Sequence, residues 1–250
     1  LFAVVPGPGS VVGQAIVANT DYVMFTGSSA TGATLAEQAG RRLIGFSAEL
    51  GGKNPMIVTK GANIADAVQG AARACYSNSG QLCISIERLY VDKAISDEFT
   101  ERFAAFVSAM KLDATYDFTA DMGSLASAAQ VDTAEAHVQD AVAKGAKVLA
   151  GGRRRADLGP FFFEPTVLGG VTDEMECYAN ETFGPVVSVY PVDSTDEAIK
   201  LANDTEYGLN ASVFAGSSAE ANAIADQLRA GTVNINEGYA AAWASTAAPM

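Results

Sequence analysis

The sequence predicts an α/β protein, and three observations lead to that fold class. Strand-like apolar runs alternate with helix-like segments, short glycine-rich turns join them, and 49% of the 250 residues are hydrophobic. That length allows one large or two modest domains with a substantial core. No internal repeat or low-complexity linker interrupts the alternation, so we expect a globular, enzyme-like protein.

The first region, residues 1–50, reads as strand, glycine-rich turn and helix, repeated. Strands are expected at 1–6, 21–26 and 42–48, and the helix-like segments between them each begin with a turn that contains several glycines. This order predicts an α/β layer with short strand-to-helix turns.

The second region, residues 51–250, reads as a mixed α/β domain. Asn63 with Asp66 three residues later is typical of a helix N-cap, Ser194 with Glu197 and Ser217 with Glu220 have capping-box spacing, and Gly145 is placed as the residue after a helix end. The expected strands are 54–59, 87–91, 147–151, 161–168, 186–192, 211–216 and 232–236. The expected helices are 63–77, 95–112, 134–145 and the two that begin at Ser194 and Ser217.

The helix at 95–112 carries an apolar stripe. Its members recur at i, i+4, i+7, i+8 and i+11, which predicts one buried face rather than a cofactor site. They are Phe99, Phe103, Phe106, Val107 and Met110.

Charge and cysteine content exclude several classes of function. A formal net charge of −13 works against nucleic-acid binding, which depends on Lys and Arg neutralising phosphates. No apolar run approaches the length of about 18 residues that a membrane span needs, and no secretory leader pattern is present. Three cysteines without CxxC spacing, beside a single histidine, favour neither a disulfide framework nor a metal site. We expect a protein of the reducing cytoplasm.

The two ends of the sequence predict a fragment. The chain starts without methionine in a strand-like run and stops at "AAPM" without a helix cap or polar tail. We therefore expect parts of the protein to be missing at both ends.

Two glycine-rich turns are candidates for nucleotide binding. "GPGSVVG" carries Gly7, Gly9 and Gly13, one residue longer in its last spacing than GxGxxG, and "GSSATG" spans residues 27–32 without the ending of a P-loop. Each could equally be an ordinary tight turn. Two in tandem, at equivalent ends of neighbouring strands, favour a nucleotide lying across the sheet.

The three cysteines differ in their surroundings. Cys75 lies in an alanine-rich helix, and Cys177 has no identifiable partner, so both are interpreted as packed, inert thiols. Cys83 follows a Gly-Gln-Leu turn and precedes a strand, where nearby backbone N–H groups could lower a thiol pKa or hold an oxyanion. A reactive Cys83 needs a base.

Histidine is a poor candidate for that base. His137 lies on a charge-rich helix, where we expect it to face solvent, so a Cys-His hydrolase is disfavoured. Glu49 is the stronger candidate, because it ends a strand immediately before Leu50-Gly51-Gly52. Spacing alone does not bring it to Cys83.

Four motifs, in order along the chain, resemble the signatures of the aldehyde dehydrogenase superfamily. Glu49 and Cys83 stand 34 positions apart (83 − 49 = 34), as parts of the paired active-site signatures. The motifs are "FTGSSATG" at 25–32, "ELGGKNP" at 49–55, "GQLC" at 80–83 and "NETFGPVV" at 180–187. Within the superfamily, "ELGGKNPMIV" and "MGSL" are most similar to the succinate-semialdehyde dehydrogenase branch, particularly its NADP-linked members.

The resemblance implies an architecture. Residues 1–50 would be the C-terminal part of a Rossmann-type NAD(P)-binding domain, and 51–250 a thiol-bearing catalytic domain. Earlier cofactor-binding positions, an oxyanion-binding asparagine and a later glycine-rich segment of the family would lie outside this chain. The 250 residues alone are therefore expected to be nearly inactive, and the full-length protein to be a homo-oligomer.

The resemblance also implies a role for each matching residue. Cys83 would be the nucleophile and Glu49 the general base, which activates water to hydrolyse a thioester after hydride transfer from the aldehyde. The coenzyme would be NADP, with NAD possible, and no metal is implied. The cofactor residues would be Gly9 and Gly13 on the adenosine side, Gly27 and Ser28 at the pyrophosphate, Leu50 at the nicotinamide, Glu181 at its ribose, and Phe183 beside that ribose.

Two alternatives remain on the sequence alone, a non-catalytic nucleotide-binding protein and a thiol acyl hydrolase on the same fold. The substrate is a further open point. Some succinate-semialdehyde enzymes carry an arginine where this chain has Ser77, and nothing shows that Arg73 or Arg88 points into the site. The substrate's carboxylate is therefore expected to be held elsewhere.

Overall fold

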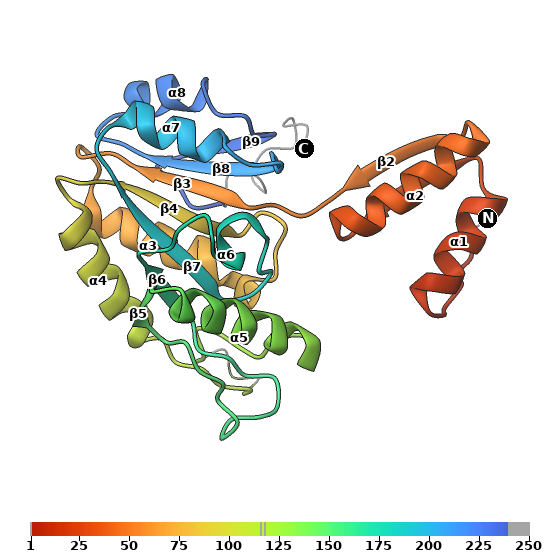
Figure 1. Cartoon of the computed structure of the whole chain (residues 1–250), viewed down its shortest axis with the longest axis horizontal. Helices are drawn as coiled ribbons and strands as arrows, with labels where there is room; N and C mark the ends of the chain where they lie inside the picture. The colour runs from red at the N-terminus through yellow and green to blue at the C-terminus, as the bar shows by residue number, and fades with distance from the viewer. Residues whose placement is uncertain (1, 116, 118, 240–250) are drawn as a thin grey trace. The chain divides into compact units, whose positions relative to one another are not determined.

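A computed structural model describes residues 2–115, 117 and 119–239 (Figure 1). The chain divides into two compact units, Leu1–Gly51 and Gly52–Met250. This division lies one residue beyond the boundary expected from the sequence. The assignment of the units as a cofactor-binding and a catalytic domain stays a prediction.

The first unit contains a small parallel sheet. Strand β1 pairs with β2 so that Tyr22 lies opposite Gly45 and Thr26 opposite Glu49. A small core of Val17, Val23 and Ala39 lies between this sheet and its helices. The elements are α1 (Gly9–Asn19), β1 (Tyr22–Thr26), α2 (Ser29–Arg42) and β2 (Gly45–Glu49).

The strand expected at residues 1–6 does not form over residues 2–6, and residue 1 lies outside the described part. Residues 2–6 run without pairing, and Phe2 and Val4 are 92% and 75% exposed. Apolar alternation predicted a strand there, but a strand also needs a neighbour to supply its hydrogen bonds. In the described part of this unit β1 pairs only with β2.

The second unit is built on a seven-stranded sheet, in the order β5-β6-β7-β4-β3-β8-β9. All neighbouring strands pair in parallel except β5 with β6. The strands are β3 (Asn54–Val58), β4 (Ile86–Asp92), β5 (Lys147–Ala150), β6 (Thr166–Gly169), β7 (Val186–Val192), β8 (Asn210–Phe214) and β9 (Thr232–Ile235).

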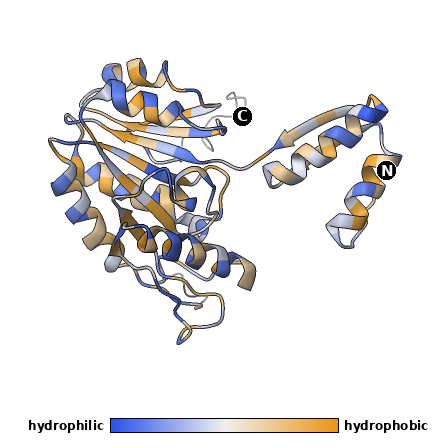
Figure 2. Ribbon diagram, in the orientation of Figure 1, coloured by the Kyte–Doolittle hydropathy of each residue, from blue (hydrophilic) through white to orange (hydrophobic). Residues whose placement is uncertain are grey.

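Helices cover both faces of this sheet. Met56 and Val58 pack with α3 and α4, whereas Ile57 between them packs with α7 and α8 on the opposite face. Central strands buried on both sides are apolar along most of their length, as Figure 2 shows. The helices are α3 (Ile64–Tyr76), η1 (Ser77–Gly80), α4 (Ser96–Ser108), α5 (Ala128–Ala143), α6 (Glu176–Ala179), α7 (Thr195–Asn203) and α8 (Ser218–Ala225).

The three helix N-caps that the sequence predicted are confirmed, whereas the helix expected to begin at residue 134 already begins at Ala128. Asn63 Oδ1 accepts the N–H groups of Ala65 and Asp66 at 3.0 and 3.4 Å. Ser194 and Ser217 accept the N–H three residues later, at 3.1 and 3.2 Å. These caps satisfy N–H groups that a helix leaves without an internal partner. Gly145, after α5, has a φ of +104°, as the predicted helix end requires.

The strand expected at 161–168 is shorter, because β6 begins at Thr166. Pro165 has no N–H to give to a ladder, and Phe163 instead forms an isolated bridge with Arg154. Among the described residues, no helix is both long and apolar enough to cross a membrane.

Candidate active site

Three loops meet at one edge of the second unit's sheet. They lead into β3, β4 and β7, and because these strands are parallel their amino ends lie at the same edge. The N–H of Gly52 donates to Oε1 of Glu181 at 2.9 Å. A Cβ at Gly52 would lie 2.6 Å from the Cys83 carbonyl oxygen, so only glycine fits there. The structure therefore brings Cys83 and Glu181 to the same place.

Cys83 lies half-buried at the junction of its loop with β4, the setting expected from the sequence. Its carbonyl oxygen accepts a hydrogen bond from Asn54 Nδ2 at 2.8 Å, and the same nitrogen lies 2.7 Å from Ser85 O. Cys75 and Cys177 are each 2% exposed, and burial raises the pKa of both thiols. None of the three forms a disulfide. Cys75 and Cys177 are thus packed in the interior, as the sequence analysis expected, and their inertness stays a prediction.

The turn before Cys83 has unusual backbone geometry. Asn78, Ser79 and Gly80 have φ values of 51°, 58° and 73°, in the left-handed region that costs a non-glycine residue about 1–2 kcal/mol. Ser79 Oγ donates to Gly123 O at 3.1 Å, which helps to hold the turn. A Cβ at Gly80 would lie 2.3 Å from Gly184 O, so this turn also contacts the loop before β7. Strained turns of this kind occur where a functional group must be aimed.

Glu181 and Phe183, both half-buried, flank Thr182 in the loop before β7. Burial raises the pKa of the Glu181 carboxyl, and the N–H of Gly52 opposes that effect. Phe183 has a φ of 50°. The described residues donate one hydrogen bond to the Glu181 carboxylate, from Gly52, so its second oxygen is left for a hydroxyl group.

A buried ion pair lies behind this loop, and the sequence analysis did not assign it a role. Lys53 Nζ and Glu87 Oε2 are 2.5 Å apart, and both side chains are 2% exposed. Glu87 also accepts the N–H groups of Thr182 and Phe183. Two adjacent charged residues, Glu87 and Arg88, at the start of the strand expected at 87–91 were the signal that could have identified Glu87, because charged residues are rarely buried unless they are paired.

The solvent-facing role expected for His137 is wrong. His137 is half-buried, and its Nδ1 lies 3.0 Å from Thr182 Oγ1. Burial lowers its pKa, and so does the neighbouring charge of Lys53. The polar composition of α5 suggested exposure, but one face of the helix packs against the loop before β7, and His137 lies on that face.

The first unit places four predicted residues at the carboxyl ends of β1 and β2. The Gly27 N–H donates to Glu49 O at 3.1 Å, so that donor is already used. Ser28 caps α2 by accepting the Thr31 N–H at 3.3 Å. Leu50 lies against Gly32, where an added Cβ would be 2.6 Å from the Leu50 side chain. Glu49 and Leu50 are both half-buried.

Each unit, taken by itself, offers a feature that would suit one part of a dinucleotide. A helix N-terminus carries partial positive charge and therefore suits a phosphate group. In the first unit, the start of α2 at Ser29 is such a terminus. The Glu181 oxygen described above suits a ribose hydroxyl. Gly9 and Gly13 would meet no described atom with an added Cβ, so the fold of the first unit does not itself require glycine there. Within the described residues, no group of three or more His, Cys, Asp or Glu side chains could hold a metal ion.

Comparison with known proteins decides the family. The sequence profile described as "Aldehyde dehydrogenase family" matches residues 1–248. The chain belongs to the aldehyde dehydrogenase family. This confirms the resemblance read from the four motifs, and with it the predicted α/β fold class.

Several aldehyde dehydrogenase relatives are similar over nearly the whole chain. "Putative succinate-semialdehyde dehydrogenase, NADP(+)" of Mycolicibacterium smegmatis is 72% identical over 100% of this chain and 48% of its own length. "Succinate semialdehyde dehydrogenase" of Acinetobacter baylyi is 35% identical over 95% of this chain and 50% of its own. A crystal structure of betaine aldehyde dehydrogenase from Staphylococcus aureus with NAD+ has a TM-score of 0.89 at 36% identity, covering 92% of this chain and 47% of that one. The chain thus spans about half the length of these relatives.

The site residues divide between the two units of this aldehyde dehydrogenase chain. Cys83, Glu181 and Phe183 lie together in the second unit. Those in the first unit are Gly9, Gly13, Gly27, Ser28, Glu49 and Leu50. Because Glu49 and Cys83 belong to different units, their pairing stays a prediction.

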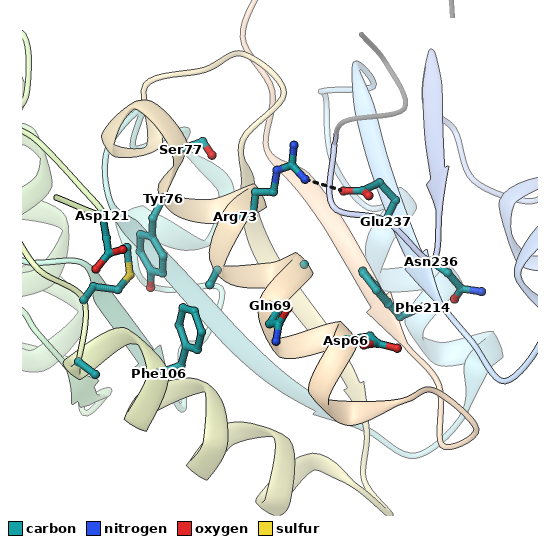
Figure 3. A pocket seen from close by; sticks show the side chains of 14 residues that line it. Asp66, Gln69, Arg73, Tyr76, Ser77, Phe106, Asp121, Phe214, Asn236 and Glu237 are labelled. Atoms are coloured by element: carbon teal, nitrogen blue, oxygen red, sulfur yellow. Dashed lines mark ion pairs between the residues drawn. The ribbon is translucent and has the colours of Figure 1, made fainter. Parts of the chain in front are cut away.

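A hollow of about 780 Å³ borders α3 and α4 in the second unit (Figure 3). Arg73, in the last turn of α3, and Ser77, the first residue of η1, both line it. Figure 3 shows Arg73 facing Glu237, and their nearest charged atoms are 3.9 Å apart. Phe106 also borders the hollow and is 43% exposed, so the sequence prediction that it is buried is wrong. Helical periodicity identified the face correctly, but α3 does not cover it at that point.

Arg88 is excluded from ligand binding by its contacts. It is 3% exposed, and its guanidinium donates to Lys53 O at 2.7 Å and to Ala202 O at 3.1 Å. Its hydrogen bonds to Tyr90 Oη and Leu201 O also lie inside the protein. Arg73, in contrast, is 56% exposed and lines the hollow together with Ser77.

Proposed function

We propose that the full-length protein oxidises an aldehyde to the carboxylic acid with NADP+ or NAD+, using Cys83 as the nucleophile and Glu49 as the general base. The observation that carries the proposal is the setting of Cys83. Cys83 is half-buried, whereas Cys75 and Cys177 are buried, and it follows the strained turn at 78–80 at the same strand edge as Glu181. A half-buried thiol whose backbone is held by Asn54 suits covalent catalysis on a small molecule.

The Cys83 thiolate would form a carbon–sulfur bond to the aldehyde carbon, and the carbonyl oxygen would become an alkoxide. Backbone N–H groups around Cys83 can stabilise that alkoxide. Asn54 holds the Cys83 carbonyl, which fixes the peptide plane that follows and so helps to aim the sulfur. Bound NAD(P)+ supplies the acceptor for the hydride that leaves this carbon, so that a thioester to Cys83 remains.

Glu49 would complete the reaction. Its carboxylate would take a proton from water as the oxygen attacks the thioester carbon, the carbon–sulfur bond would break, and the acid would leave with the Cys83 thiolate restored. Glu49 ends β2 beside the start of α2, and its carbonyl is held by the Gly27 N–H. The base would thus lie next to the helix terminus proposed to bind the coenzyme's pyrophosphate.

NADP is the coenzyme we favour, with NAD as a second possibility. The Mycolicibacterium relative carries NADP(+) in its name, and the Staphylococcus structure was solved with NAD+. Gly27 and Ser28 would lie at the pyrophosphate, Gly9 and Gly13 on the adenosine side. Leu50, Phe183 and Glu181 would contact the nicotinamide and its ribose.

Succinate semialdehyde is the proposed substrate. Two relatives bear that substrate in their names. Ser77 cannot pair with its distal carboxylate as an arginine would, but Arg73 lies one helical turn before it and lines the same hollow. The Arg73–Glu237 pair is long and exposed, so a substrate carboxylate could replace Glu237 at a cost of about 0–1 kcal/mol. The predicted homo-oligomer and cytoplasmic location accompany this proposal.

The test is formation of the reduced coenzyme, followed by its ultraviolet absorbance, in full-length protein given a panel of aldehydes with NADP+ and with NAD+. Coenzyme reduction with succinate semialdehyde, lost in Cys83→Ser, supports the proposal. Acid release from thioesters without coenzyme reduction would instead indicate an acyl hydrolase. Coenzyme binding without turnover of any aldehyde would indicate a non-catalytic protein.

A further inference from the structure

We infer that Glu87 is a positioning residue, which sets the place of Glu181 and Phe183 by accepting hydrogen bonds from the backbone between them. The inference rests on the proposed function, in which Glu181 and Phe183 contact the coenzyme. We assign the positioning of Glu181 and Phe183 to the hydrogen bonds that the Glu87 carboxylate accepts, and not to its ion pair with Lys53.

The geometry of the acceptor is the first argument. Oε1 of Glu87 receives the N–H of Thr182 and that of Phe183, both at 3.0 Å, and Oε2 lies 2.9 Å from the Thr182 nitrogen. One carboxylate thus binds two consecutive N–H groups. Phe183 has a φ of 50°, a conformation that a non-glycine residue adopts at a cost. The hydrogen bonds to Glu87 offset that conformational free-energy cost, and they keep both N–H groups pointing into the protein.

The second argument is that the contact closes a ring. Glu87 Oε2 binds Lys53, the peptide bond joins Lys53 to Gly52, Gly52 N–H binds Glu181 Oε1, and the chain leads from Glu181 to Thr182 and back to Glu87. Every link in this ring is a covalent bond or a hydrogen bond of 3.0 Å or less. A shift of the Thr182 backbone would therefore move Glu181 as well.

The other contacts of the loop before β7 involve different groups of Thr182, so Glu87 is the acceptor for the Thr182 and Phe183 N–H groups. Gln130 Nε2 donates to Thr182 O at 2.8 Å, and His137 contacts Thr182 Oγ1. These two hold the carbonyl and the hydroxyl. Thr182 is 1% exposed, so without Glu87 its N–H would be buried with no acceptor among its described neighbours.

Burial makes a purely stabilising role for the ion pair a weak explanation. Lys53 and Glu87 are both 2% exposed, and replacing such a pair by apolar groups of similar size is often neutral or stabilising. The pair is costly to desolvate, so something other than stability should account for it. Fixing the loop beside Cys83 does so.

Two double variants of the full-length protein separate acceptor from charge. Lys53→Met with Glu87→Gln removes both charges but keeps a side-chain oxygen that can accept, whereas Lys53→Met with Glu87→Leu removes the acceptor as well. We expect the Gln variant to hold the coenzyme within about threefold of wild type, and the Leu variant to bind it about tenfold more weakly or worse, by calorimetric titration without aldehyde. Both variants should lose stability, because Gln brings buried amide N–H groups and Leu leaves the Thr182 and Phe183 N–H groups without an acceptor, so each titration is made on folded protein well below both melting temperatures.

A purely structural role predicts instead that the folded Gln and Leu variants bind the coenzyme with equal affinity, and that result would overturn the inference. If the Leu variant does not fold, Glu87→Asp with Lys53 retained replaces it. That change keeps the charge but withdraws the acceptor by one methylene, so coenzyme binding should weaken by about threefold or more. Unchanged binding in Glu87→Asp would overturn the inference too. Wild-type protein that binds neither coenzyme would refute the proposed function itself, whereas tight wild-type binding that the variants share refutes only the role of Glu87.

Discussion

Asn54 donates its side-chain amide to the carbonyl oxygen of Cys83, with 2.8 Å between Nδ2 and the oxygen. The same side chain accepts the Asn210 N–H at 3.1 Å through Oδ1. Asn54 is the first residue of β3, and it thereby joins the Cys83 loop to β8, which lies on the other side of β3. One buried amide fixes the backbone of the proposed nucleophile.

Asn54→Ala should therefore cost both stability and catalysis. It leaves the Cys83 and Ser85 carbonyls and the Asn210 N–H without this partner, and each buried group left unpaired costs about 1–3 kcal/mol. We expect a loss of about 2–4 kcal/mol in denaturant unfolding, together with slower alkylation of Cys83 or a lower kcat. Asn222→Ala is the control, because that exposed side chain bonds only Ser218 O within its own helix. Equal effects of the two changes would contradict this role of Asn54.

Gly80→Ala should damage the turn before Cys83. The new Cβ would lie 2.3 Å from Gly184 O, and the φ of 73° is itself unfavourable for alanine by about 1–2 kcal/mol. We expect thermal destabilisation and a loss of coenzyme reduction larger than the loss of folded protein. Gly123→Ala is the matched control, since its Cβ would meet nothing within 4 Å. Wild-type turnover in Gly80→Ala would show that the turn geometry does not matter to catalysis.

The sequence predicted most elements because their signals are local. Asn63, Ser194 and Ser217 bond backbone within three residues, and apolar runs such as 186–192 mark strands wherever they pair. Because these contacts join residues close together in the chain, the elements can be predicted from a single sequence.

The missed features depend on contacts between distant segments. Glu87 meets Thr182 across 95 positions, and His137 meets the same residue across 45. The strand predicted at residues 2–6 and the burial predicted for Phe106 were both wrong. A strand needs a neighbouring strand to pair with and a core residue needs a segment packed over it, and periodicity in the sequence shows neither. The pairing of Glu49 with Cys83 is of this long-range kind, which is why the family motifs suggest it and spacing does not.

Arg73→Gln should change substrate preference. If Arg73 binds the distal carboxylate, KM for succinate semialdehyde should rise about tenfold or more while KM for butanal stays near wild type. Glu237→Gln should lower KM for succinate semialdehyde, because it releases Arg73 from its 3.9 Å partner.

Arg102→Gln serves as the control for that pair of variants. Arg102 pairs with Glu98 on α4 at a similar exposure, 55% against 56% for Arg73, but it does not line the hollow. Equal changes in KM for both aldehydes in Arg73→Gln would show that Arg73 does not recognise the carboxylate.

His137 should make the stability of the protein fall in mild acid. Burial and the charge of Lys53 lower its pKa, while Glu87, Glu176 and Asp140 oppose the shift. A histidine whose folded-state pKa is lowered contributes stability above its unfolded pKa of about 6.5, and that stability is lost as the pH falls through the folded-state pKa.

We therefore expect the wild type to lose more unfolding free energy than His137→Asn between about pH 7.5 and about pH 5. Acid-sensitive carboxylates are common to both proteins and cancel in the comparison. A steeper loss in His137→Asn would reverse the sign and contradict the buried, neutral state of His137.

The account's central claim is that Cys83 attacks the aldehyde and that Glu49 releases the acid. Glu49→Gln keeps the thiol but removes the water-activating base, whose loss typically slows the step that it serves by about 10²–10⁴. The most direct measurement is intact-protein and peptide mass spectrometry of full-length Glu49→Gln, mixed with aldehyde and coenzyme. We predict a rapid formation of about one equivalent of reduced coenzyme per active site, with an acyl group accumulating on Cys83. An acyl group on Cys75 or Cys177 but not on Cys83, or steady turnover at the wild-type rate, would contradict the account.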